Sequence, residues 1–232
     1  MKIAGTTALV TGANRGFGRA LAAELIARGA TVYAAARNPE SVDLPGAIPI
    51  ALDITDPASV AAAVAKAGDV QLLINNAGSP PAADLLNDDF AAIQAEFDVH
   101  FFGTLATTRA FAPVIAGNGG GGIVNVLSVL SWVSFPHFGA YSAAKSASWS
   151  ATNALRQQLA PQGVRVAGVH VGYMDTDMAA AVTDPKLNPA EAARIAVDGI
   201  ESDLTEILLD DTSRHVQAGL AGGVAALYPA VA

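Results

Sequence analysis

The chain contains no cysteine among its 232 residues, which excludes disulfide bridges, thiolate zinc sites and thiol nucleophiles, and no metal site is expected. Positive charge is also scarce: 13 Lys and Arg residues stand against 21 Asp and Glu, giving a net charge of −8 without a basic run. A nucleic-acid partner is therefore not expected. No apolar run reaches the roughly 20 residues that span a bilayer, and the first residues lack the apolar segment of a secretion signal. We expect a cytoplasmic protein without a membrane partner.

Apolar runs of strand length alternate with segments of helical period along the whole chain, which is 52% hydrophobic and only 15% charged. Strands are expected at 6–11, 30–36, 47–52, 70–75, 121–128, 163–171 and 206–209. Helices are expected at 16–28, 56–67, 87–117 with a break near Gly103, 141–160, 189–201 and near 211–221. This alternation predicts an α/β fold, a doubly wound, Rossmann-like sheet of seven parallel strands with helices on both faces, as one domain over residues 1–232. Its ligand crevice is expected beyond the carboxyl ends of the strands.

A glycine-rich turn follows the first expected strand and opens the first expected helix. It reads Thr11-Gly12-Ala13-Asn14-Arg15-Gly16-Phe17-Gly18. Free backbone N–H groups and the positive end of the helix dipole form an anion site there, suited to the pyrophosphate of a dinucleotide. A glycine triplet alone also fits a plain structural turn. Its position between strand and helix favours the dinucleotide site.

Three further strand ends carry candidate cofactor contacts. The second strand runs into Arg37, where an NAD-binding protein usually offers a carboxylate to the ribose 2′-hydroxyl. Arg37 and Arg15 could instead bind a 2′-phosphate, and although either could be a solvated arginine, the missing acid favours NADP. After the third strand, Asp53 and Ile54 are better placed to reach a ligand than Thr55 or Asp56, which resemble a helix cap before Pro57. The fourth strand ends in Asn75-Asn76-Ala77-Gly78, which lets a flat ligand approach closely or forms an ordinary turn.

Proton-transfer chemistry is indicated by Tyr141 and Lys145, four residues apart on one helix face. A lysine ammonium beside a phenol lowers its pKa toward the range of a general acid or base. Ser128 ends the fifth strand thirteen residues before Tyr141, with Ser131 and Ser134 as ordinary loop competitors. Taken alone, this tyrosine–lysine spacing is common by chance and usually indicates a surface helix.

In this order the motifs resemble those of the short-chain dehydrogenase/reductase family over nearly the whole chain. Thr11, Gly12, Gly16 and Gly18 match its T-G-x-x-x-G-x-G turn, and residues 75–78 match its N-N-A-G element. The resemblance implies that Ser128, Tyr141 and Lys145 are catalytic and that Asp53 contacts the adenine side of the cofactor. It also implies that arginines at positions 15 and 37 mark NADP-preferring members. Gly172 and Thr176 keep the family's places near the nicotinamide, whereas Val171 replaces a proline.

His100 stands where the family has an asparagine that helps hold a water between the lysine and a proton path. A neutral imidazole offers one donor and one acceptor and could hold this water. Its protonation at about pH 6 to 7 would then weaken reduction on the acid side. Alternatively, His100 packs in the core with its nitrogens satisfied by the backbone.

These features predict an NADPH-dependent carbonyl reductase, reversible as an alcohol dehydrogenase, acting on small to medium hydrophobic ketones, aldehydes or secondary alcohols. The alternatives are a redox sensor or scaffold that binds NADP without turnover, and a 3-oxoacyl-thioester reductase, which the negative charge disfavours because an acyl carrier is acidic. Trp132, Phe135, Phe138, Tyr173 and residues 177–182 either line a hydrophobic substrate pocket or pack internally. Apolar and small residues on the helices at 104–117 and 141–160, together with the family resemblance, predict a homo-oligomer, a tetramer or a dimer.

Overall fold

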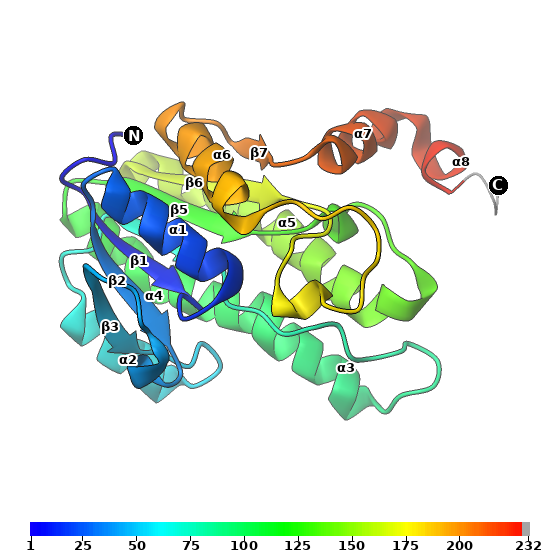
Figure 1. The fold of residues 1–232 in the computed structure, drawn as a ribbon, viewed down its shortest axis with the longest axis horizontal. Coiled ribbons are helices and arrows are strands. Elements are labelled where there is room, and N and C mark those ends of the chain that lie inside the picture. Colours follow the sequence, from blue (N-terminus) through cyan, green and yellow to red (C-terminus); the bar gives the residue numbers. More distant parts are fainter. Residues whose placement is uncertain (229–232) are drawn as a thin grey trace.

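Seven parallel strands form one sheet in the computed structural model, which describes residues 1–228 (Figure 1). The strand order is β3-β2-β1-β4-β5-β6-β7. The strands are β1 (Thr7–Thr11), β2 (Thr31–Ala36), β3 (Ala47–Ala51), β4 (Leu72–Asn75), β5 (Gly121–Val126), β6 (Val164–His170) and β7 (Glu206–Leu208). The chain order reverses between β1 and β4, and this is the switch point at which such sheets bind ligands. The expected fold class is confirmed; residues 229–232 of the expected domain lie outside the described residues.

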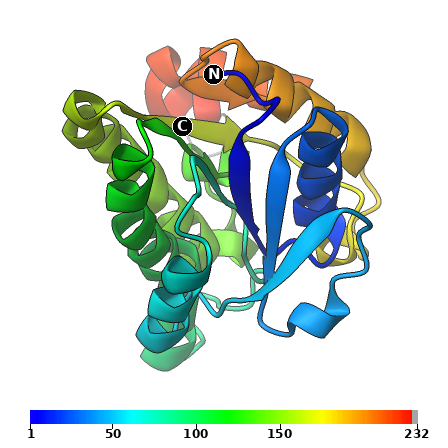
Figure 2. The same ribbon diagram turned by 90° about the vertical axis from the view of Figure 1, so that its left-hand side faces the viewer.

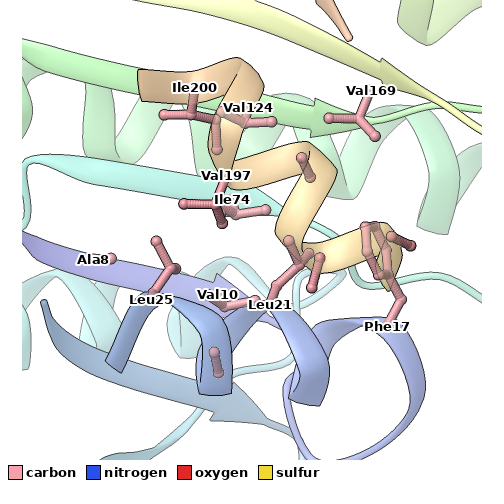
Figure 3. Packing of buried hydrophobic residues seen from close by; sticks show 14 of the residues in the cluster. Ala8, Val10, Phe17, Leu21, Leu25, Ile74, Val124, Val169, Val197 and Ile200 are labelled. Carbon is pink, nitrogen blue, oxygen red and sulfur yellow. The ribbon is translucent and has the colours of Figure 1, made fainter. Parts of the chain in front are cut away.

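Helices cover both faces of the sheet (Figure 2). On one face lie α1 (Gly16–Ala27) and α6 (Pro189–Glu201), and on the other α2 (Pro57–Lys66), α4 (Thr104–Gly117) and α5 (Gly139–Leu159). Figure 3 shows side chains of α1 and α6, among them Leu21 and Val197, packed over Val10, Ile74 and other apolar residues of the central strands. The central strands are buried on both faces, which explains their continuous apolar sequence.

Helix capping follows the sequence signals. Asp56 accepts a hydrogen bond from the backbone N of Ala58 at 2.9 Å and precedes Pro57, so it caps α2. Asn188 caps α6 in the same way, accepting from the backbone N of Ala190 at 2.8 Å before a proline at the first helical position. Asp56 therefore has the structural role that the sequence suggested.

The segment expected as one long helix over 87–117 has three parts. Helix α3 (Phe90–Phe97) continues into a π-helical stretch, Asp98–Gly103, and then into α4. Gly103 is the last residue of this stretch, and a Cβ there would lie 2.8 Å from the Ile54 side chain. A π-helical stretch widens the turn and is frequent at functional sites. The break predicted near Gly103 is thus a change of helix type, and it carries His100.

The start of α5 and the C-terminal segment differ from the helix bounds expected from the sequence. Helix α5 begins two residues before the expected start, at Gly139, where a Cβ would lie 2.6 Å from Leu85 Cδ1. The C-terminal segment forms α7 (Asp211–Gly219), where a helix near 211–221 was expected, and then a short α8 (Gly223–Leu227), which was not. Figure 1 shows both extending past the end of β7. Within residues 1–228, no helix is long and apolar enough to cross a membrane.

Candidate active site

The glycine turn between β1 and α1 has the backbone that an anion site requires. Gly12 and Gly16 adopt φ values of +66° and +54°, in the left-handed region that favours glycine. A Cβ on Gly18 would lie 2.2 Å from the main-chain oxygen of Gly12, so only glycine permits this approach of helix to strand. Arg15 precedes the helix in an extended conformation, and its side chain does not cap the free N–H groups. These groups remain available to a phosphate, and the cradle fits a dinucleotide.

The turn is tied to the end of β4 through Thr11. Its Oγ1 accepts hydrogen bonds from the backbone N of Asn76 and of Ala77, each at 2.9 Å. The Asn76 side chain donates to the main-chain oxygen of Thr11 at 2.9 Å. A Cβ on Gly12 would lie 3.0 Å from Ala77 Cα. The structure thus brings the two predicted cofactor motifs into direct contact at the switch point.

Other predicted cofactor contacts surround this turn. Asp53 accepts hydrogen bonds from the backbone N and Oγ1 of Thr55, and these lower its pKa, with a smaller contribution from the charge of Arg37. Arg37 is exposed at the end of β2, while exposed Arg15 forms an ion pair with Asp177 at 3.3 Å. Both arginine side chains therefore lie at the surface beside the turn, where a 2′-phosphate can reach them.

Burial limits what three residues of the predicted cofactor set can offer to a ligand. The Phe17 side chain lies in the hydrophobic core (Figure 3), so this residue can offer only its backbone to a ligand. The Ile54 side chain is also buried, in the second core cluster. Asn14 is half-buried within the turn. The side chains of Phe17 and Ile54 therefore have a packing role in the core.

The opposite wall of the site comes from the loop after β6. A Cβ on Gly16 would lie 3.3 Å from Thr176 Cγ2, so this loop closes against the glycine turn. The backbone N of Gly172 donates to Asp210 Oδ2 at 2.7 Å. Val171, in the place of the family's proline, accepts a hydrogen bond from the backbone N of Val129 at 3.1 Å through its main-chain oxygen. Thr176 therefore lies next to the glycine turn despite the substitution, while Gly172 lies against Asp210 at the start of α7.

Ser128, Tyr141 and Lys145 converge beyond the ends of β4 and β5, and all three are buried. Lys145 Nζ lies 5.7 Å from the centre of the Tyr141 ring and donates to the main-chain oxygen of Val126 at 2.8 Å. Ser128 begins a short 3₁₀ turn, Val129–Ser131, and its Oγ accepts from the backbone N of Leu130 at 3.1 Å. The neighbouring serine also has a structural role, because Ser131 Oγ donates to the main-chain oxygen of Ser128.

Burial dominates the protonation of this group. It raises the pKa of Tyr141, against a lowering contribution from the hydrogen bond with Ser128. It lowers the pKa of Lys145 to about 8, which the charge of Glu96 partly opposes. The expectation of a lowered Tyr141 pKa is wrong for this structure, because desolvation of the phenol predominates. Tyr141 is therefore a protonated phenol at neutral pH, the form that can donate a proton.

His100 lies directly against Tyr141, with ring centroids 4.8 Å apart in an edge-to-face arrangement. Its Nε2 lies 3.3 Å from Ser79 Oγ and 3.4 Å from Glu96 Oε2, whereas its Nδ1 has no hydrogen-bond partner. Burial lowers the pKa of His100, and the charge of Lys145 lowers it further, while Glu96 raises it. Its protonation therefore falls below the ordinary imidazole range rather than at the pH expected from the sequence.

Glu96 is the buried acid that the sequence analysis missed. It is 3% exposed, its Oε1 accepts from the backbone N of Ala82 at 2.7 Å, and its Oε2 has no hydrogen-bond partner. An acid in a helical segment usually faces solvent. The sequence signal that could have identified Glu96 was its spacing from His100, because residues four apart lie on one helix face.

The residues expected around a substrate pocket differ in their exposure. Phe135, Tyr173 and Met178 are exposed in the loops that border the site. The Trp132 ring instead stacks on His170, with centroids 3.7 Å apart. Trp132 is thus a packing residue beneath the Ser128 turn.

A family model described as short chain dehydrogenase matches residues 6–187. The chain belongs to the short-chain dehydrogenase/reductase family. It is therefore an oxidoreductase acting on CH–OH or C=O groups, and the resemblance inferred from the sequence is confirmed.

Individual members of this family are similar over almost the whole chain. A short-chain dehydrogenase from Burkholderia cenocepacia, solved in complex with NADP, has a TM-score of 0.93 and 39% identity over 99% of this chain and 98% of its own. D-erythrulose reductase from Gallus gallus is 31% identical over 93% of each chain. Ketoacyl reductase HetN from Nostoc sp. is 31% identical over 90% of this chain and 79% of its own.

Proposed function

We propose that this short-chain dehydrogenase/reductase is an NADPH-dependent carbonyl reductase, reversible as an alcohol dehydrogenase. Its substrates are small to medium hydrophobic ketones, aldehydes or secondary alcohols. The observation that carries the proposal is the convergence of Ser128, Tyr141 and Lys145 beside the glycine turn.

In this proposal the bound nicotinamide cofactor supplies the hydride for reduction and accepts it in the reverse direction. Ser128 Oγ donates a hydrogen bond to the substrate oxygen, and Tyr141 donates the proton that converts it to a hydroxyl. Lys145, held at the main-chain oxygen of Val126, places a positive charge beside the phenol and stabilises the phenolate left behind. His100 and Glu96 hold the water that returns a proton to this group.

The choice of NADP over NAD is supported by the two exposed arginines beside the turn. Arg37 follows β2 at the place where a carboxylate would favour the ribose 2′-hydroxyl, and Arg15 lies at the start of α1. The Burkholderia cenocepacia relative with NADP bound is consistent with this choice.

A second candidate is a 3-oxoacyl-thioester reductase, which the name of the Nostoc relative favours. The net charge of −8 favours the first candidate, because a carrier protein is itself acidic and would be repelled. A cytoplasmic location and an assembly of two or four copies belong to the proposal as well.

The test is a screen of the purified protein with NADPH and NADP against ketones, aldehydes, secondary alcohols and 3-oxoacyl thioesters. We expect turnover of hydrophobic ketones, aldehydes or secondary alcohols with kcat/KM above that of the thioesters. Turnover of thioesters alone would favour the second candidate. No oxidation or reduction of any compound would favour a non-catalytic sensor.

A further inference from the structure

A second cluster of buried polar side chains lies behind the catalytic residues, at the carboxyl end of β6. His170, the last residue of this strand, is fully buried. Its Nε2 lies 2.5 Å from Glu206 Oε2 on β7. Its Nδ1 lies 3.2 Å from Ser131 Oγ and 3.3 Å from the main-chain oxygen of Ser128. The imidazole therefore bridges the edge strand of the sheet and the turn that begins with Ser128.

The hydrogen bonds around His170 define which protons it carries. Ser131 Oγ donates to the main-chain oxygen of Ser128 at 2.6 Å, so its one hydrogen is already used. Both atoms that face Nδ1 are then acceptors, and the Glu206 carboxylate that faces Nε2 is also an acceptor. A ring protonated on both nitrogens donates to each side, whereas a neutral ring places a lone pair against oxygen atoms.

The surroundings of the ring suit a buried cation. The Trp132 indole stacks on His170 with an interplanar angle of 13° at 3.7 Å, a geometry that stabilises a charged ring. Gly168, on the same strand, makes room for the ion pair, because a Cβ there would lie 3.1 Å from Glu206 Oε2. Arg156 of α5 is the other charged side chain at the pair and donates to Glu206 Oε1 at 3.0 Å.

Glu206 remains ionised in this environment. Burial raises its pKa, but the hydrogen bond and charge of His170, together with Arg156, bring the pKa below its usual value. The carboxylate thus lies between an imidazole and a guanidinium, each contributed by a different element of the fold.

We propose that His170 is a positioning residue for the catalytic serine. Protonated on both nitrogens, it donates to Glu206 on one side and to the Ser128–Ser131 turn on the other, which fixes the direction of the Ser128 side chain toward Tyr141. The role of Ser128 as a hydrogen-bond donor to the substrate rests on the proposed function. The protonated bridge itself does not depend on it.

The bridge can be tested by the fluorescence of Trp132. The chain has two tryptophans, so a Trp149→Phe background leaves Trp132 as the only reporter. Contact with a protonated imidazole quenches indole emission more than contact with a neutral one. At neutral pH we expect this emission to be quenched, and adding Glu206→Gln raises it because the imidazolium loses its carboxylate partner. Equal emission with and without Glu206→Gln would overturn the bridge.

Two further variants identify the source of the signal. His170→Gln in the same background raises the emission at least as far as Glu206→Gln does, whereas His215→Gln, at an exposed histidine of α7, leaves it unchanged. Raised emission in His215→Gln, or unchanged emission in His170→Gln, would contradict the assignment to His170. Circular dichroism and thermal melting of each variant verify that the fold is retained.

The positioning role is tested by kinetics in the same variants. We expect His170→Gln and Glu206→Gln to lower kcat on the order of tenfold, because the serine shifts, while the Kd for NADPH stays unchanged. A normal kcat together with the predicted fluorescence shift would make the bridge a purely structural feature and refute the positioning role. Absence of turnover in the unmodified protein would instead refute the proposed function, on which the measurement of Trp132 emission does not depend.

Discussion

Replacing Gly18 by alanine removes the close approach of α1 to β1 on which the cofactor cradle depends. The new Cβ would lie 2.2 Å from the main-chain oxygen of Gly12 and 2.4 Å from Asn76 Nδ2, where an ordinary van der Waals contact is about 3.5 Å. The oxygen belongs to the backbone, so the conflict is relieved only by a displacement of the helix start of roughly 1 Å.

Two opposing contributions set the magnitude of the effect. Alanine is favoured over glycine within a helix by about 0.5–1 kcal/mol, whereas overpacking typically costs about 1–3 kcal/mol. The steric cost predominates here because both nearest atoms are held by the turn. We expect Gly18→Ala to lower the free energy of unfolding by roughly 1–2 kcal/mol. A displacement of about 1 Å in the phosphate-binding N–H groups is expected to weaken NADPH binding by about 100-fold.

Urea unfolding and a fluorescence titration with NADPH measure these two effects. Gly117→Ala is the matched control, because Gly117 ends α4 and a Cβ there has no atom within 4 Å. This control should raise the free energy of unfolding by about 0.4–1 kcal/mol and leave NADPH binding unchanged. Unaltered stability and affinity in Gly18→Ala would refute the steric reasoning and the placement of the cofactor at this turn.

Four other outcomes follow from the site. We expect NADPH to be preferred over NADH by at least ~1.4 kcal/mol, a factor of about ten in kcat/KM, and Arg37→Asp to reverse this preference. Equal efficiency with both cofactors would refute the binding of the 2′-phosphate by Arg15 and Arg37. The rate of reduction should decline above about pH 8 as Lys145 loses its charge. Glu96→Gln should move this decline to lower pH, because the Glu96 carboxylate raises the pKa of Lys145; an unchanged pH–rate profile would exclude this effect of Glu96 on Lys145. His100→Asn should remove an acid limb that lies below the ordinary imidazole range, and superimposable pH–rate profiles would leave His100 a structural residue. Sedimentation at micromolar concentration should give a dimer or tetramer, and the mass of one chain would refute the assembly.

The architecture could be predicted because its signals are local. Buried strands such as β4 are short apolar runs, and several helices begin at a recognisable cap, as α2 does at Asp56. The π-helical stretch at 98–103 could not be predicted, because one inserted residue changes the helical turn without a compositional signal. The short α8 was missed for a related reason, since a five-residue helix has too few residues for a periodic pattern.

The candidate site was predictable where residue type alone specifies the chemistry, as for Tyr141 and Lys145. The direction of the Tyr141 pKa shift was not predictable from the sequence, because it depends on how fully the phenol is desolvated. Glu96 was missed because its burial depends on the segment around Ala82, whose backbone N donates to it. The bridge from His170 to Glu206 joins residues 36 positions apart on neighbouring strands, and only the register of the sheet brings them together.

The most direct test of the central claim is the rate of NADPH consumption with a hydrophobic ketone or aldehyde by the unmodified protein and by Tyr141→Phe. Phenylalanine retains the ring that packs against His100 and removes only the hydroxyl that donates the proton. The proposal predicts turnover by the unmodified protein. It predicts at most about a few per cent of that rate in Tyr141→Phe, with NADPH affinity changed by no more than about threefold. A Tyr141→Phe protein that keeps a larger share of the activity would contradict the assignment of Tyr141 as the proton donor.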